Sequence, residues 1–327
     1  MKLGKISGYI VFVIILFLLP IFLTSSEYYL HVFILCGINV ILAISLRAIT
    51  TTGQISLGHA GFMSIGAYTS AILAMKAGVP VYGALILGAL AAMAVAAIIA
   101  FPITRVRTVY LAMLTMFFGT LISLIFTEWR GLTGGTSGLM GIPQLGTISI
   151  PGLINIEFAT KLPYSYFILV LALIVILFLY AIDRSYLGMT FKSIAQDEFL
   201  AASIGTNIAN HKAIIFCIGC FFAGLAGSFY AHYNSVLTPD TFGLFPSLYI
   251  MVYVIVGGGK RFAGAIIGAI VLTILPEAFR VVKEYQPFVF VAVLFIVIFA
   301  LRGGLVTLPD VIKAQIKKIH RRKAENA

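Results

Sequence analysis

Long apolar runs separated by short polar stretches dominate the chain. Such a run needs about 20 residues to cross the hydrocarbon core of a bilayer as a helix, with a working range of about 17–25. Ten runs are candidates, at residues 8–26, 28–46, 55–75, 80–101, 108–127, 164–182, 213–235, 244–258, 262–279 and 287–301. Because unpaired peptide groups are costly in lipid, only helices and closed β-barrels span a membrane. The runs lack the alternation of apolar and polar residues that is typical of barrel strands, so they are expected to be helices. The pattern therefore predicts an all-α, polytopic transmembrane helical bundle of about ten spans.

Composition supports a membrane protein. Hydrophobic residues make up 61% of the 327 positions and charged residues 10%, with a mean hydropathy of +1.08. A soluble globular chain has about 25% charged residues, and a disordered chain is polar and rich in charge. A cytosolic enzyme and a disordered protein are both excluded. Lys2 and Lys5 precede the first run as in a signal peptide, but no small-residue cleavage site follows, so we expect this helix to be retained.

The distribution of basic residues predicts the orientation. If the N-terminus is cytoplasmic and the ten segments alternate, 17 Lys and Arg residues lie inside and 5 outside. Cytoplasmic loops of membrane proteins carry this excess, so both termini are expected in the cytoplasm. We divide the chain into a permease domain, residues 1–312, and a basic cytoplasmic tail, residues 313–327, expected to lie on the anionic inner leaflet. Topology thus accounts for most of the +11 charge, and nucleic-acid binding is a poor alternative.

Two loops are longer than a simple connection requires. Residues 128–163 form a glycine-rich external loop, and residues 183–212 form a cytoplasmic one. Within the second loop, residues 193–205 predict one short amphipathic helix, with Asp197 and Glu198 near its start and Gly205 as its stop. Such a helix either lies on the membrane or docks onto a soluble partner.

The third apolar segment is unusually polar. Gln54, Ser56 and His59 would be costly against lipid, and glycines surround them. Irregular backbone at membrane depth is tolerated where protein buries it or where it lines a wet cavity. One interpretation is a broken helix that binds a zwitterionic solute, and the other is close packing around a satisfied histidine. Gly264 and Gly268, a G-x-x-x-G pair, favour close helix packing.

The sequence contains no recognisable site for chemistry. A phosphate-binding P-loop needs glycine five residues before Gly259 and Ser or Thr after Lys260, but Val254 and Arg261 stand there. The five histidines have no acidic partner at ligand spacing, and the Cys217/Cys220 pair is interpreted as helix packing. No carboxylate falls at mid-depth in the ten segments, which argues against a proton-driven carrier. We expect the energy for transport to come from another chain.

Four sequence blocks together resemble the LivM-type permeases of branched-chain amino acid ABC importers. The blocks are TTGQISLGHAGFMSIGAYTSAIL (51–73), GLTGGTSGLMGIP (131–143), RSYLGMTFKSIAQDEFLAASIGTNIANHKAIIFCIGCFFAGLAGSFYAHY (184–233) and VGGGKRFAGAIIGA (256–269). They occur in the expected order and cover much of the chain.

The resemblance implies a multi-pass subunit of the bacterial inner membrane without its own ATPase site or cofactor. It implies a LivH-like second permease subunit, two cytoplasmic ATPase subunits that use ATP, and an external substrate-binding protein. The residues that it assigns to ATPase coupling are Arg184, Lys192, Asp197, Glu198, Ala201, Ala202 and Gly205. We expect the translocation path to include Gln54, Ser56, His59 and Tyr68, and the receptor side of the external loop to include Thr133, Gly134, Gly135 and Ser137.

Three alternatives remain open at this stage. The same fold could import urea or short amides, since no residue identifies the side chain of the substrate. The chain could instead be a sodium-coupled carrier, because backbone carbonyls can hold sodium. It could also be a membrane scaffold without transport activity, although that would leave the polar third segment unexplained.

Overall fold

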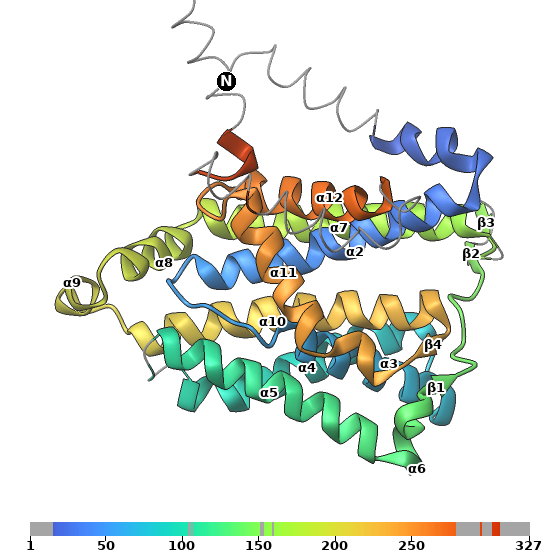
Figure 1. Ribbon diagram of the computed structural model, residues 1–327, viewed down its shortest axis with the longest axis horizontal. Helices are drawn as coiled ribbons and strands as arrows, with labels where there is room; N and C mark the ends of the chain where they lie inside the picture. Colours follow the sequence, from blue (N-terminus) through green and yellow to red (C-terminus); the bar gives the residue numbers. More distant parts are fainter. Residues whose placement is uncertain are drawn as a thin grey trace, which may run out of the picture.

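The computed structural model describes residues 16–103, 106, 108–150, 154–158, 160–278, 295 and 303–307. They form a bundle of long helices with short pieces of strand (Figure 1). The helices of the bundle are α2 (Glu27–Thr50), α3 (His59–Lys76), α4 (Val81–Ile103), α5 (Thr108–Glu128), α7 (Lys161–Arg184), α10 (Ile208–Asn234), α11 (Leu244–Gly257) and α12 (Phe262–Ala278). The short elements are η1 (Leu23–Ser25), α6 (Arg130–Thr133), η2 (Gly135–Ser137), α8 (Tyr186–Gln196), α9 (Glu198–Ser203), η3 (Pro239–Phe242) and η5 (Leu305–Thr307), with strands β1 (Leu139–Met140), β2 (Ile148–Ile150), β3 (Ile154–Ile156) and β4 (Val236–Leu237).

The eight long helices coincide with eight of the ten predicted segments. Six stretches among the described residues are long and apolar enough to cross a membrane: α2, α4, α5, α7, α10 and the combined stretch of η3 and α11. Helix α3 is more polar than these, and α12 is shorter. The first predicted segment is described only from residue 16, and segment 287–301 and the tail lie outside the described residues. The total of ten spans and the cytoplasmic termini stay predictions.

Small residues bring α3, α4 and α10 into close contact. A Cβ atom on Gly66 would lie 2.2 Å from the carbonyl oxygen of Gly224, and one on Gly227 would lie 1.9 Å from that of Met63. The hydroxyl of Ser228 donates to the Gly66 carbonyl at 3.0 Å. Membrane helices associate through such close backbone approach, since lipid provides little hydrophobic force between them. These three helices form the tightest part of the bundle.

A second group of helices surrounds α2, which packs against α7, α10, α11 and α12. Within this group, the prediction of close packing at Gly264 and Gly268 is confirmed. A Cβ atom on Gly268 would lie 2.0 Å from the carbonyl oxygen of Tyr253, and one on Gly264 would lie 2.1 Å from that of Gly258. The glycine pair therefore holds α12 against α11.

The mostly helical fold is confirmed, with two short antiparallel strand pairs beside it: β1 with β4, which joins Leu139 to Leu237, and β2 with β3. One sequence-based expectation needs correction. The single helix expected over residues 193–205 is two helices, because the extended backbone of Asp197 ends α8 and begins α9. Gly205 stands after α9 with a φ of +85°, in keeping with its predicted role as a stop.

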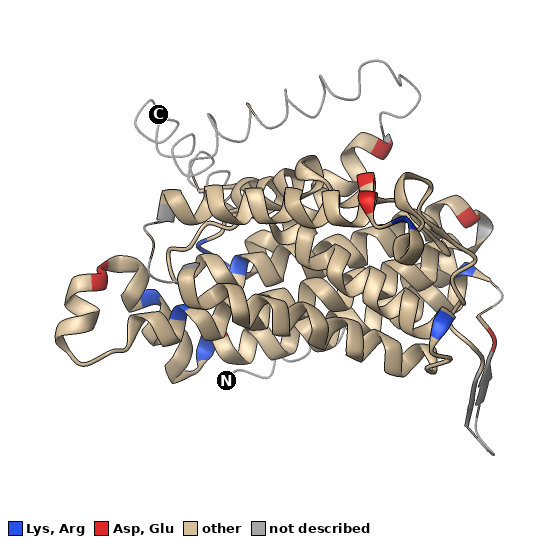
Figure 2. Ribbon diagram, turned by 90° about the horizontal axis from the view of Figure 1, so that it is seen from below, with Lys and Arg blue, Asp and Glu red and all other residues tan. Residues whose placement is uncertain are grey.

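The bundle has two distinct ends. Helices α2 and α7 end, and α10 begins, at the end from which α8 and α9 project, here called the α8–α9 end (left in Figure 1). Among the described residues, six basic side chains lie at this end, on α2, α7, α8, α10 and the α11–α12 turn: Arg47, Arg184, Lys192, Lys212, Lys260 and Arg261. Three lie at the opposite end: Lys76, Arg130 and Lys161 (Figure 2).

Candidate functional site

The polar segment between α2 and α3 turns back into the bundle. Helix α2 ends at Thr50, and the chain then runs without helix or strand to Gly58. His59, the first residue of α3, places its Nε2 atom 2.8 Å from the Ser45 hydroxyl, more than one turn before the end of α2. A Cβ atom on Gly58 would lie 2.0 Å from the carbonyl oxygen of Thr115 on α5. Protein therefore surrounds this irregular backbone. Both interpretations of the segment, a broken helix that binds a solute and close packing around a histidine, are compatible with this arrangement.

The predicted path residues fall at two levels of the bundle. Gln54, Ser56 and His59 are all buried near the α8–α9 end. Tyr68 lies more than two turns further along α3, where its ring stacks on Phe126 with centroids 4.2 Å apart. Each of these four side chains has a buried polar atom with no hydrogen-bond partner among the described residues. Buried polar groups are normally paired, so both levels are suited to binding a polar group.

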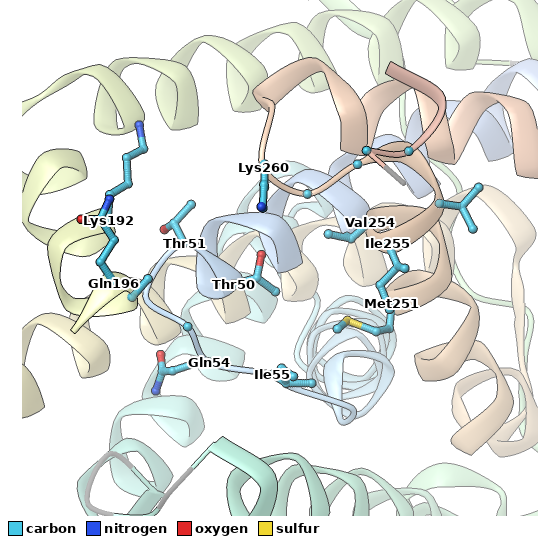
Figure 3. A pocket seen from close by; sticks show the side chains of 17 residues that line it. Thr50, Thr51, Gln54, Ile55, Lys192, Gln196, Met251, Val254, Ile255 and Lys260 are labelled. Atoms are coloured by element: carbon cyan, nitrogen blue, oxygen red, sulfur yellow. The ribbon is translucent and has the colours of Figure 1, made fainter. Parts of the chain in front are cut away.

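A cavity of about 730 Å³ lies at the α8–α9 end. Figure 3 shows its walls: Thr50, Thr51 and Gln54 from the turning segment, Lys192 and Gln196 from α8, and Met251, Val254 and Ile255 from α11, with Lys260 between them. The Gln54 side chain is only 1% exposed, and its oxygen accepts from the Thr52 hydroxyl at 3.1 Å. The Nε2 amide group of Gln54 has no hydrogen-bond acceptor among the described residues.

A buried ion pair joins α2 to α7 beside this cavity. The Arg47 guanidinium, 3% exposed, donates to the Asp183 carboxylate at 3.0 Å and to the Gly259 carbonyl at 3.3 Å. Lys192 donates to the other oxygen of Asp183 at 3.1 Å. Lys192, which the resemblance assigns to ATPase coupling, thus has a partner within this chain. The pairing of Arg47 with Asp183 was not predicted from the sequence. The one indication in the sequence is that each of these charges directly follows an apolar run.

Helices α8 and α9 project from the bundle with an ordered backbone. The Asp197 carboxylate accepts from the Phe199 and Leu200 amides at 2.8 and 3.1 Å, which caps α9. Glu198 accepts from the buried Lys212 ammonium at 2.6 Å, tying α9 to the start of α10. Ala201 is buried and Ala202 is exposed. Arg184 lies at the end of α7, with its guanidinium 5.3 Å from the centroid of the Tyr180 ring.

The predicted receptor-side residues form a tight turn at the opposite end. Thr133 is buried, and its hydroxyl donates to the Phe126 and Trp129 carbonyls, so it shapes the turn. Gly134 and Gly135 adopt φ values of +77° and +64°, which glycine tolerates best. Ser137 is exposed, so its side chain is accessible to a partner.

Comparison with known proteins connects these features to a family. The family model described as the branched-chain amino acid transport system permease component matches residues 28–301. This range includes the turning segment, the cavity walls up to α12 and the whole α8–α9 projection. The chain belongs to this permease family. The predicted family resemblance is confirmed, and the chain is a multi-pass membrane protein of a transport system.

Two curated permeases are similar to this family member. Both are named high-affinity branched-chain amino acid transport system permease protein LivM, from Escherichia coli strain K12 and from Salmonella typhimurium strain LT2. Each is 30% identical to the chain over 274 residues, covering 76% of this chain and 61% of the relative. The matched part therefore spans less than two thirds of the length of these relatives. No solved structure matches the chain.

Proposed function

We propose that this permease imports branched-chain or closely related amino acids as a subunit of an ATP-binding-cassette importer. The observation that carries the proposal is the family match, which places the projecting α8–α9 pair inside a permease component. The chain would form a route across the inner membrane of a bacterium, while ATP is hydrolysed on partner subunits. Its partners would be a LivH-like second permease, two cytoplasmic ATPases and an external substrate-binding protein.

The surface of α9 supports docking of an ATPase. Phe199 and Ile204 are 83% and 80% exposed, and Leu200 is also exposed, on a segment that stands away from the bundle. Clusters of exposed apolar residues commonly mark protein interaction sites. The Asp197 cap and the pair between Glu198 and Lys212 hold this surface in one orientation. A partner that moves α9 would then also move the start of α10.

The charge distribution supports a cytoplasmic location for the α8–α9 end. Six of the nine basic residues in the described part lie there. Cytoplasmic loops carry the excess of Lys and Arg in membrane proteins. In this orientation the cavity beside Gln54 forms the inner part of the route, and the turn at Ser137 faces the external receptor.

Uptake of radiolabelled leucine tests the proposed function. Cells that lack this gene, and have no other leucine transporter, should take up far less leucine at low substrate concentration than cells with the gene restored. Unchanged uptake would contradict the proposal.

The alternative functions are distinguished by other measurements. Ligand binding to the partner receptor distinguishes leucine from urea or short amides, because the receptor delivers the substrate. A sodium-coupled carrier would instead transport without ATPase partners, and a scaffold would show no solute-dependent stimulation of ATP hydrolysis.

Substitutions on α9 test the docking surface. Phe199→Ser and Ile204→Ser should reduce co-purification of the ATPase subunits and ATP hydrolysis stimulated by loaded receptor by about tenfold, the effect of losing roughly 1.4 kcal/mol of binding. Met140→Ser is the control for co-purification of the ATPase subunits, because Met140 is also exposed, at 65%, but lies in β1 at the opposite end. Normal ATPase association in both α9 variants would contradict the docking assignment.

A further inference from the structure

A second, smaller cavity lies between α2 and α11. Four residues along one face of α2 line one wall: Leu35, Ile38, Asn39 and Leu42. Residues with the same spacing on α11 line the facing wall: Pro246, Tyr249, Ile250 and Tyr253. The i, i+3, i+4, i+7 spacing means that both helices present a continuous stripe to the cavity. Its volume is about 160 Å³.

The cavity lies at the middle of α2, which is a candidate membrane span. Helix α2 has 24 residues, and its cavity-lining stripe occupies the central eight, residues 35–42. With a rise of about 1.5 Å per residue, about 12 Å of helix lies on either side of the stripe. Binding sites of membrane transporters commonly lie near this depth, where neither side of the membrane has direct access.

The lining combines apolar walls with neutral polar groups. Leu35, Ile38, Leu42 and Ile250 supply apolar surface, and the lining contains no charged residue. An apolar cavity of about 150 Å³ is large enough for benzene, so this volume suits the hydrocarbon side chain of an amino acid. A charged side chain would lose its hydration there without gaining a partner of opposite charge.

Polar groups lie where they could meet the rest of such a solute. Asn39, at the centre of α2, donates from its amide to Thr273 at 3.0 Å, and its side chain lines the cavity. Thr241 lines the cavity from η3, where its hydroxyl lies 2.9 Å from that of Thr238, just before the extended backbone of Gly243 separates η3 from α11. Helix α11 begins at Leu244, directly after this turn, and the positive end of its dipole favours a carboxylate there.

We propose that this cavity binds the aliphatic side chain of the transported amino acid at mid-membrane. Ile38, Leu42 and Ile250 contact the side chain, and Asn39 and Thr241 bind the polar end. The cavity thus selects uncharged, apolar amino acids during translocation, in addition to any selection by the external receptor. This inference rests on the proposed import function.

Two substitutions test the cavity in the complete complex, reconstituted in liposomes with its ATPases and loaded receptor. Ile250→Trp fills the cavity, and Asn39→Leu removes the amide at nearly constant volume. The measured quantity is the amount of leucine transported per ATP hydrolysed. This ratio should fall by about tenfold for Ile250→Trp and by several fold for Asn39→Leu. Steric and hydrogen-bond changes in a binding pocket commonly have effects of this size. ATP hydrolysis itself should persist, because neither residue lies on α8 or α9.

Ile174→Trp provides the matched control, because Ile174 is 57% exposed on α7 and lines neither cavity. It should transport leucine with the wild-type ratio. Wild-type ratios in both cavity variants would overturn the cavity assignment while leaving the import function intact. If Ile250→Trp does not assemble, a wild-type ratio in Asn39→Leu overturns it alone. A wild-type complex that transports no leucine would overturn the import function and, with it, this inference.

Discussion

At the scale of single residues, the burial of charge decides how much each ion pair beside the large cavity contributes to stability. Arg47 is almost completely buried, and its guanidinium relies on Asp183 and the Gly259 carbonyl for compensation. Removing one partner from a buried pair leaves an uncompensated charge, whereas replacing both partners with apolar residues is often neutral. Lys192, by contrast, is well exposed, so its pairing with Asp183 contributes less.

Asp183→Asn should therefore destabilise the protein strongly. We expect a loss of about 3–5 kcal/mol in the free energy of unfolding, because the Arg47 charge remains buried without its counter-ion. The double variant Arg47→Met with Asp183→Leu should recover most of this loss. Lys192→Met is the control and should cost no more than about 1 kcal/mol. Thermal unfolding of the purified protein in detergent measures all three, and a destabilisation in the double variant equal to that of Asp183→Asn would contradict this account.

The sequence predicts polar residues at this scale better than their partners. Gln54, Ser56 and His59 are identified because polar side chains are exceptional in an apolar run. The bond from His59 to Ser45 and the pair of Arg47 with Asp183 join positions that are 14 and 136 residues apart. Such pairings depend on which helices become neighbours, and one sequence does not specify this.

At the scale of helices, apolar length is the most informative sequence signal. It locates eight helices of the bundle close to their observed bounds. It does not reveal the break at Asp197, since Asp is compatible with both a helix start and a helix interior near the N-terminus. Nor does it show which glycines contact a neighbouring helix, because α3, α4 and α10 all contain several.

Gly227→Ala should disrupt the contact between α10 and α3. The added methyl group would lie 1.9 Å from the Met63 carbonyl oxygen, so the helices must separate. We expect markedly less folded protein and a lower melting temperature, since overpacking costs about 1–3 kcal/mol. Gly83→Ala is the control, because its nearest neighbour is Val79 at 3.6 Å and the change should be nearly neutral. Equal melting temperatures for the two variants would contradict the close-packing assignment.

Asp197→Ala should loosen α9 without affecting the bundle. The substitution removes the acceptor for the Phe199 and Leu200 amides, and losing a helix cap costs about 1 kcal/mol. Hydrogen exchange should become about fivefold faster in α9, as expected for a local loss of this size, and remain unchanged in α10. Unchanged exchange in α9 would show that the cap does not hold this helix.

At the scale of the whole molecule, the chain has a helical bundle and a separate projection at one end. The small cavity lies between α2 and α11, and the large cavity lies at the α8–α9 end. Helix α8 forms part of the wall of the large cavity and is bonded to α7 through Lys192 and Asp183. Movement of α8 and α9 would therefore reach the walls of the large cavity through Lys192 and Gln196. Under the proposed function, the force for transport is applied to α8 and α9 by partner subunits.

Transport by reconstituted liposomes tests this dependence most directly. Leucine accumulation is measured with this chain alone under a sodium or proton gradient, and with the complete complex of second permease, ATPases and receptor supplied with ATP. We predict accumulation only in the complete complex, and none when ATP is replaced by an analogue that cannot be hydrolysed. Accumulation of leucine by this chain alone, without ATP, would contradict the account.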